Sequence, residues 1–179
     1  GTHMQSQAVP LVKPHSPIVG TGMEKMVSAV MGRVTRASGD GEVVYSDGQK
    51  VIFKAKGSSE VTYKIDSFQR TSQATAYTQR SMVKTGQKVK KGDLLIDGPS
   101  SQNGELALGQ NLLIAYASYD GLGYEDAIVI SDRLVKEDIL SSIHIEKYEA
   151  AVVETKLGPE ETTRDIPNVS EEDLANLDE

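Results

Sequence analysis

The sequence predicts a mainly β protein, built as a small barrel-like or sandwich-like β domain with a few short helices. Asp-Gly turn signals at Asp40-Gly41 and Asp47-Gly48 separate runs that are rich in β-branched and aromatic residues. Gly86, Gly92 and Gly98 then punctuate short apolar pieces, as the tight corners of a small barrel require. Helical periodicity is confined to short stretches.

Composition narrows the classes of protein. The chain has 179 residues, no cysteine and no long apolar run, so we expect a soluble protein without disulfides or thiolate metal sites. A net charge of -7 argues against a free-standing nucleic-acid binder. The charge is uneven, because residues 84–91 (KTGQKVKK) are basic and residues 160–179 are acidic. A solvated face is the default interpretation of both runs.

The chain is expected to begin with an extended arm and a short helix. Residues 1–4 (GTHM) resemble the remnant of a cloning tag and are set aside. Three prolines between residues 10 and 17 disfavour helix and central strand, so we expect an arm that lies along a larger partner. Thr21 and Glu24 have the spacing of a capping box. They predict a helix whose methionines pack on the core.

The β-rich region is expected from residue 32 onward. The two Asp-Gly signals predict consecutive hairpins, and the alternation of Val61, Tyr63 and Ile65 predicts a further strand. Apolar runs predict buried strands in three later segments, at residues 111–121, 126–131 and 144–156.

Two more short helices are predicted after these runs. Each begins with a serine in the N-cap position, Ser131 in one and Ser170 in the other. The second also carries acidic residues in its first turn, where the helix dipole favours negative charge.

Glu125 and Asp126 are adjacent carboxylates between a glycine-rich bend at residues 121–123 and an apolar run. Neighbouring side chains on a strand point to opposite faces, so the pair is expected at the mouth of a strand. Carboxylate oxygens are the ligands that Mg²⁺ prefers, together with waters and phosphates. A nucleotide-phosphate site is therefore chemically admissible, while the end of a hairpin is the commoner setting of such a pair.

Residues 82–100 also resemble the hairpins of barrel-sandwich hybrid domains, including biotinyl and lipoyl carriers. These carriers need a modifiable lysine at an exposed hairpin tip, and Lys25 in MEKM superficially fits. Because Lys25 falls within the predicted helix, this interpretation keeps the fold and loses its functional group. A stand-alone carrier or binding module of this type is the alternative hypothesis.

A longer series of blocks resembles the central part of the β subunit of bacterial-type DNA-directed RNA polymerase. The blocks are, in order, MQSQAVP, VGTGMEK, KKGDLLIDGPS, GELALGQN, YEDAIVIS, SIHIEKYE and TKLGPEETTRDIPNVSE. The match runs from about Gln5 to the last residue. The chain is thereby identified as a fragment of a subunit that takes part in nucleotidyl transfer only within the assembled enzyme.

The resemblance implies cofactors and partners. Mg²⁺ is implied in the assembled enzyme, with none bound to the fragment, which is expected to be inactive alone. The implied partners are the β′ and α subunits, the DNA template, the RNA:DNA hybrid and nucleoside triphosphates, with transcription factors as further candidates. No membrane is implied, and the expected location is the bacterial cytoplasm.

The resemblance also implies roles for individual residues. Tyr124, Glu125 and Asp126 match a family motif near the second Mg²⁺ and the incoming nucleotide. Glu125 and Asp126 are thus expected to act on that metal indirectly or transiently, because the primary metal-binding aspartates belong to the other large subunit. Gln7 matches a glutamine near the RNA 3′ region. Ser6 replaces an arginine at the border of the rifamycin pocket.

A domain organisation follows from the resemblance. After the tag remnant, residues 5–31 form the arm and helix, and residues 32–100 form the barrel-like or sandwich-like region. Residues 101–155 form part of a double-psi β-barrel in the hybrid-binding region, and residues 156–179 form an acidic entry to the flap. A third hypothesis makes this acidic end a docking platform for a basic partner.

Overall fold

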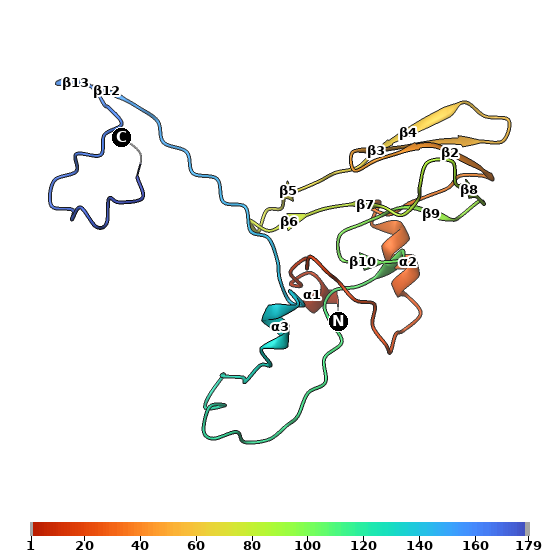
Figure 1. Ribbon diagram of the computed structural model, residues 1–179, viewed down its shortest axis with the longest axis horizontal. Helices are drawn as coiled ribbons and strands as arrows, with labels where there is room; N and C mark the ends of the chain where they lie inside the picture. The colour runs from red at the N-terminus through yellow and green to blue at the C-terminus, as the bar shows by residue number, and fades with distance from the viewer. Residues whose placement is uncertain (1, 178–179) are drawn as a thin grey trace. The chain divides into compact units, whose positions relative to one another are not determined.

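The chain is described by a computed structural model that covers residues 2–177 (Figure 1). Strands in this range form a four-stranded sheet, a three-stranded sheet and three two-stranded hairpins, accompanied by short helices. The predicted mainly β class with a few short helices is therefore confirmed. The chain divides into two units, of which one ends at Ile145 and the other begins at Glu146. Each unit is described by itself.

The larger sheet is antiparallel and has the order β4-β3-β2-β8. Its strands are β2 (Gly41–Ser46), β3 (Lys50–Ala55), β4 (Glu60–Lys64) and β8 (Lys88–Val89). Alternate side chains on β2 and β3 point inward, because successive residues of a strand face opposite sides. Val43, Val51 and Phe53 are completely buried in consequence.

The second sheet has the order β1-β9-β7 and shares its core with the first. Its strands are β1 (Thr35–Arg36), β9 (Leu94–Asp97) and β7 (Arg80–Ser81). Leu95 and Ile96 of β9 are fully buried and belong to the same apolar cluster as Phe53 of β3. Residues 35–97 therefore contain two sheets that share one apolar core.

The two Asp-Gly signals have different structural roles. Asp47-Gly48 forms the predicted hairpin between β2 and β3, where the Asp47 carboxylate accepts hydrogen bonds from the backbone N–H groups of Gln49 and Lys50, both at 2.7 Å. These two donors lower the pKa of Asp47.

The hairpin predicted at Asp40-Gly41 does not form. β1 pairs with β9 rather than with β2. Gly41 instead begins β2, where an added Cβ would lie 2.1 Å from the Lys54 carbonyl oxygen. Asp40 accepts a hydrogen bond from the Lys91 N–H at 2.9 Å. This glycine is required by close backbone approach and not by a turn.

The three later glycines divide in the same way. Gly86 and Gly92 adopt φ values of 81° and 89°, as predicted for tight turns that only glycine enters without strain. Gly98 lies outside that region, and an added Cβ would be 2.9 Å from the Arg33 carbonyl oxygen.

Helix α2 (Glu24–Val30) begins later than the capping-box spacing predicted, with Met23 rather than Thr21 in the N-cap position. The Glu24 carboxylate accepts hydrogen bonds from the N–H groups of Thr21 at 2.7 Å and Gly22 at 2.8 Å, which lower its pKa. The expected packing of the methionines is wrong, because Met23 and Met26 are about half exposed and Ser28 is the buried residue. The helix is too short to bury a wide apolar face against the β10–β11 hairpin (Ser101–Gln102 and Glu105–Leu106).

The remaining short elements of the first unit are two helices and one hairpin. Helix α1 (Thr2–Gln5) lies at the amino end, and β5 (Gln69–Arg70) pairs with β6 (Ala76–Tyr77). Helix α3 (Arg133–Lys136) starts as predicted after Ser131, whose hydroxyl accepts a hydrogen bond from the Arg133 N–H at 3.3 Å.

The second unit contains one short hairpin, β12 (Glu154–Thr155) with β13 (Gly158–Pro159), among the residues described. The helix predicted after Ser170 does not form, and residues 171–176 adopt turns instead. The Asp173 N–H still donates to the Ser170 hydroxyl at 3.3 Å. Leu174 is buried, but a lone apolar side chain stabilises a helix little because helix nucleation is costly.

The strands predicted beyond residue 110 are largely missing. Residues 111–131 contain only turns and irregular backbone, and residues 144–156 contribute a bridge at His144 and strand β12. A strand needs a neighbour that satisfies its N–H and C=O groups. No segment within residues 2–177 provides that neighbour for residues 111–131.

Candidate functional site

Glu125 and Asp126 lie in the second of two successive turns and not at the mouth of a strand. The first turn is closed by a hydrogen bond from the Leu122 N–H to the Tyr119 carbonyl at 2.8 Å, and the second by one from the Ala127 N–H to the Tyr124 carbonyl at 3.2 Å. Asp120 and Gly121 both have positive φ, as in a type I′ turn.

Glu125 itself has a φ of 56°. A residue with a Cβ enters this left-handed region at a cost of roughly 1–2 kcal/mol. Both Glu125 and Asp126 are exposed. The bend therefore presents two neighbouring carboxylates to solvent from a backbone that is not in its lowest-energy form.

The acidic pair can supply part of a metal site but not a complete one. Mg²⁺ is commonly bound through one or two carboxylates, several waters and substrate phosphates, and two exposed carboxylates fit that pattern. Within residues 2–177 no group of three or more His, Cys, Asp or Glu side chains is placed to hold an ion.

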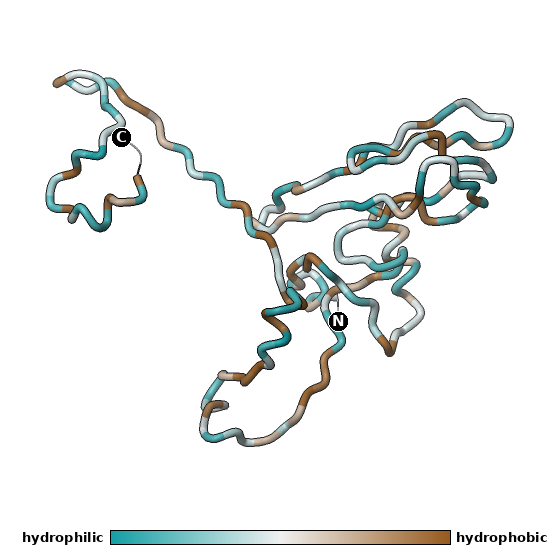
Figure 2. The backbone as a smooth tube through the Cα atoms, viewed as in Figure 1, coloured by the Kyte–Doolittle hydropathy of each residue, from teal (hydrophilic) through white to brown (hydrophobic). Residues whose placement is uncertain are grey.

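The segment around the pair contains apolar stretches, drawn in brown in Figure 2, and its large apolar side chains are exposed. Leu113 and Tyr116 are essentially fully exposed, and Ile128 is 84% exposed. Monomeric proteins rarely leave such a contiguous apolar surface in water unless it meets a partner. The acidic pair thus lies in a segment whose large apolar side chains are exposed to solvent.

Ser6 and Gln7 lie directly after helix α1. The Ser6 hydroxyl donates to the His3 carbonyl at 2.7 Å, and the Gln7 amide nitrogen lies 2.9 Å from His3 Nε2. Both contacts involve a residue of the presumed tag remnant. No hydrogen bond among the described residues joins Ser6 or Gln7 to the acidic pair.

The arm that follows is irregular, with bends at residues 12–13 and 18–19 and a bridge at His15. The Val12 N–H donates to the Ser141 carbonyl and the His15 N–H to the Gly109 carbonyl, both at 2.9 Å. An apolar cavity of about 310 Å³ is lined by arm residues and by Phe68 and Tyr77. Its described lining is mostly apolar and contains no carboxylate or histidine.

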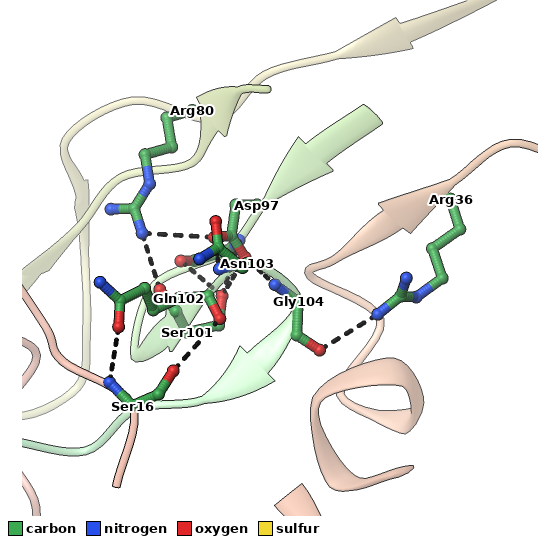
Figure 3. Close-up of polar contacts among 9 residues, drawn as sticks. Ser16, Arg36, Arg80, Asp97, Ser101, Gln102, Asn103 and Gly104 are labelled. Carbon is green, nitrogen blue, oxygen red and sulfur yellow. Dashed lines mark hydrogen bonds and ion pairs between the residues drawn. The ribbon is translucent and has the colours of Figure 1, made fainter. Parts of the chain in front are cut away.

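A buried polar cluster around Asp97 was not anticipated from the sequence (Figure 3). The Asp97 carboxylate is completely buried at the end of β9. It accepts hydrogen bonds from the Ser101 hydroxyl at 2.5 Å, from the Asn103 N–H at 2.8 Å and from Arg80 Nη2 at 3.3 Å. The N–H of Gly104 donates to it at 3.2 Å.

The cluster extends to neighbouring elements. Arg80 Nη2 also donates to the Ser101 carbonyl at 2.7 Å, Arg36 Nη2 donates to the Gly104 carbonyl at 3.1 Å, and the Ser16 N–H donates to the Gln102 side chain at 2.7 Å. These contacts join the three-stranded sheet, the β10–β11 hairpin and the arm. A buried carboxylate with this many donors is satisfied, and we assign it a structural role. The only sequence signal is the run DGPSSQNG, in which Asp, Ser and Asn are all turn formers.

Lys25 lies on helix α2 and is exposed. A carrier lysine would stand at a hairpin tip. The structure therefore supports the sequence-based objection to the carrier hypothesis.

Comparison with known proteins defines the class. The family described as RNA polymerase Rpb2, domain 6, matches residues 36–179, and the chain belongs to this family. None of the helices within residues 2–177 has both the length and the apolar composition needed to cross a bilayer.

The individual relatives all carry the name of one polymerase subunit. The chain is 50% identical over 179 residues to the DNA-directed RNA polymerase subunit beta of Streptococcus sanguinis, 51% identical to that of Streptococcus thermophilus and 49% identical to that of Streptococcus agalactiae. Each alignment covers all of this chain and 15% of the relative. The resemblance to the bacterial β subunit is thereby confirmed, and the chain spans about one seventh of the curated relatives that it matches.

Proposed function

We propose that this chain contributes to the active centre for DNA-templated RNA synthesis and to the binding of the RNA:DNA hybrid within an assembled polymerase. The relatives named DNA-directed RNA polymerase subunit beta support this assignment. The observation that carries it is the exposed Glu125-Asp126 bend on an uncovered apolar segment. Such a bend suits a site completed by other segments and subunits.

The proposed role of the acidic pair is to assist nucleotide entry. Mg²⁺, when bound, neutralises charge on the triphosphate in nucleotidyl transfer. Glu125 and Asp126 would hold the second metal indirectly or transiently, since residues 2–177 bring no third ligand to them. Their exposed oxygens can accept hydrogen bonds from water and orient it. The primary metal-binding aspartates are assigned to another subunit.

The proposed role of Gln7 is a contact to phosphate or sugar near the RNA 3′ end. An amide can donate to such groups without reading sequence. Ser6 lies next to it and replaces the arginine at the rifamycin-pocket border. A serine hydroxyl is shorter and uncharged, so we expect altered sensitivity to rifamycins in the assembled enzyme.

The remaining parts of the proposal concern organisation and partners. Residues 32–100 form the sandwich-like region, residues 101–155 part of a double-psi β-barrel and residues 156–179 the entry to the flap. The missing strands at residues 111–131 are consistent with a barrel whose other strands come from elsewhere. The proposed partners are the β′ and α subunits, template DNA, the RNA:DNA hybrid, nucleoside triphosphates and transcription factors, in the bacterial cytoplasm.

The test uses the assembled enzyme with the double substitution Glu125→Gln and Asp126→Asn. Removing both charges should slow single-nucleotide addition at limiting nucleotide by about 10- to 100-fold, as loss of indirect metal contacts commonly does. The readout is the rate of RNA extension in a stopped-flow or quench-flow assay.

Asp120→Asn is the matched control, because Asp120 is an exposed carboxylate in the adjacent turn of the same segment. It should leave the rate unchanged. An unaltered rate in the double variant at limiting nucleotide would remove the proposed role of the acidic pair. The isolated chain, assayed alone, should extend no RNA.

A further inference from the structure

Strand β4 is the outer strand of the four-stranded sheet. It pairs with β3 on one side, and within residues 2–177 no strand pairs with its other side. Figure 1 shows β4 at the margin of this sheet. All of its residues except Tyr63 are exposed. An edge strand of this kind presents unpaired N–H and C=O groups to another chain.

The register with β3 determines which backbone groups are unpaired. The Ile65 N–H donates to the Gln49 carbonyl at 2.7 Å. Hydrogen-bonded and non-hydrogen-bonded pairs alternate along an antiparallel ladder, so Val61 and Tyr63 exchange hydrogen bonds with β3. The backbone groups of Glu60, Thr62 and Lys64 consequently point away from the sheet.

These three residues are complementary to the same three residues of a second copy when the two strands run antiparallel. If Thr62 is placed opposite Thr62 of a second copy, Glu60 falls opposite Lys64 of that copy, and Lys64 opposite its Glu60. All of the pairs so formed are of the hydrogen-bonded kind, because the same three residues carry the outward N–H and C=O groups. Opposite charges directly across two strands stabilise the pairing.

The charges inside the sheet favour the same arrangement. Lys64 lies opposite Lys50 of β3, and like charges in that position repel. Glu60 lies opposite Lys54, with 3.5 Å between Lys54 Nζ and the Glu60 carboxylate. Pairing through Thr62 would place a second copy's Glu60 next to Lys64, which relieves the repulsion between Lys64 and Lys50.

The other face of the strand also gains contacts. Val61 is 41% exposed, and Tyr63 packs against the edge of the core. In the same register Val61 falls opposite Tyr63 of the second copy, as a non-hydrogen-bonded pair in which side chains approach most closely. Aromatic and β-branched pairs of this kind stabilise sheets.

We propose that β4 is a self-association edge, through which two copies of this chain join antiparallel about Thr62 into one continuous sheet. The inference concerns a surface that the proposed polymerase function does not use. The partner strand is β4 of a second copy, because Glu60 and Lys64 flank Thr62 and each meets its opposite charge when the two strands run antiparallel.

The test is sedimentation of the 179-residue chain at concentrations up to about 1 mM, the limit of weak association. The wild-type chain should dimerise in a concentration-dependent manner. Thr62→Pro should be monomeric throughout, because proline removes an outward N–H at an edge position that tolerates it. Thr62→Val keeps that N–H and should dimerise like the wild type. Circular dichroism establishes that each variant is folded.

Charge exchange provides an independent measurement. Glu60→Lys and Lys64→Glu should each weaken dimerisation by about tenfold, because each places like charges opposite one another on both sides of Thr62. The double variant Glu60→Lys, Lys64→Glu should restore it. A monomeric wild-type chain, a dimer that is indifferent to Thr62→Pro, or a double variant no tighter than the single ones would each overturn the proposal.

Discussion

The two sheets of residues 35–97 and the segment of residues 111–131 contain similar side chains in opposite states. Val43, Val51 and Phe53 are completely buried, whereas Leu113, Tyr116 and Ile128 are almost completely exposed. Both regions are rich in aliphatic and aromatic residues. They differ in that each strand of the first region has a hydrogen-bonded neighbour. An apolar run therefore specifies a strand only together with the strand that pairs with it.

The largest expected effect separates the two regions by stability. Phe53→Ala removes a fully buried ring from the shared core and should lower the free energy of unfolding by about 3–5 kcal/mol. Ile128→Ala removes a side chain that is 84% exposed and should change it by less than about 0.5 kcal/mol.

Urea unfolding followed by circular dichroism provides both values. Equal losses from Phe53→Ala and Ile128→Ala would break the comparison, because they would mean that residues 111–131 also pack in solution.

A somewhat smaller effect tests the polar part of the ordered region. Asp97→Ala leaves the guanidinium of Arg80 and the N–H groups of Asn103 and Gly104 without their shared acceptor. Removing this buried acceptor is expected to destabilise the fold by about 1–3 kcal/mol, because the half-exposed Arg80 side chain stays partly solvated. Asp126→Ala is the matched control in the exposed segment, where the same change should have little effect. The midpoint of thermal unfolding distinguishes the two, and similar midpoints would argue that Asp97 is solvated.

The smallest effect concerns pH. Hydrogen bonds from the N–H groups of Gln49 and Lys50 lower the pKa of Asp47 below its ordinary value of 3.8. A carboxyl with a depressed folded-state pKa contributes stability above its unfolded-state value, and loses it as the pH falls through the folded-state value. The β2–β3 turn should therefore loosen only below about pH 3.8.

The measurement is an NMR titration of the Gln49 and Lys50 amide resonances. Asp47→Asn should abolish their shared titration, since an amide does not ionise in this range. Amide shifts that move with a midpoint above 3.8 would contradict the assigned hydrogen bonds.

Local signals predicted the ordered region well. Asp47-Gly48 specifies its hairpin through side-chain contacts within three residues, and the alternation of Val61 and Tyr63 matches β4. Asp40-Gly41 fails because its partners, Lys54 and Lys91, are far away in the sequence. Such long-range contacts leave no local pattern.

The candidate site was predictable only in part. A bend at residues 121–123 follows from the glycines there, but the turn that contains Glu125 and Asp126 and the left-handed backbone of Glu125 do not. The Asp97 cluster was missed because Arg80 and Ser101 are brought to it by the pairing of β7 with β9 and by a loop.

The crowding around Gly41 has a consequence for sequence change. An added methyl group at Gly41 would collide with backbone atoms of Lys54 and Ala55, whereas one at Gly48 would meet open space. Backbone atoms in a paired strand cannot move aside as a flexible side chain can. In a library that randomises both positions and is selected for folding, position 48 should accept many amino acids, whereas position 41 should retain glycine. Two identical dipeptides, seven residues apart, are thus under different constraints.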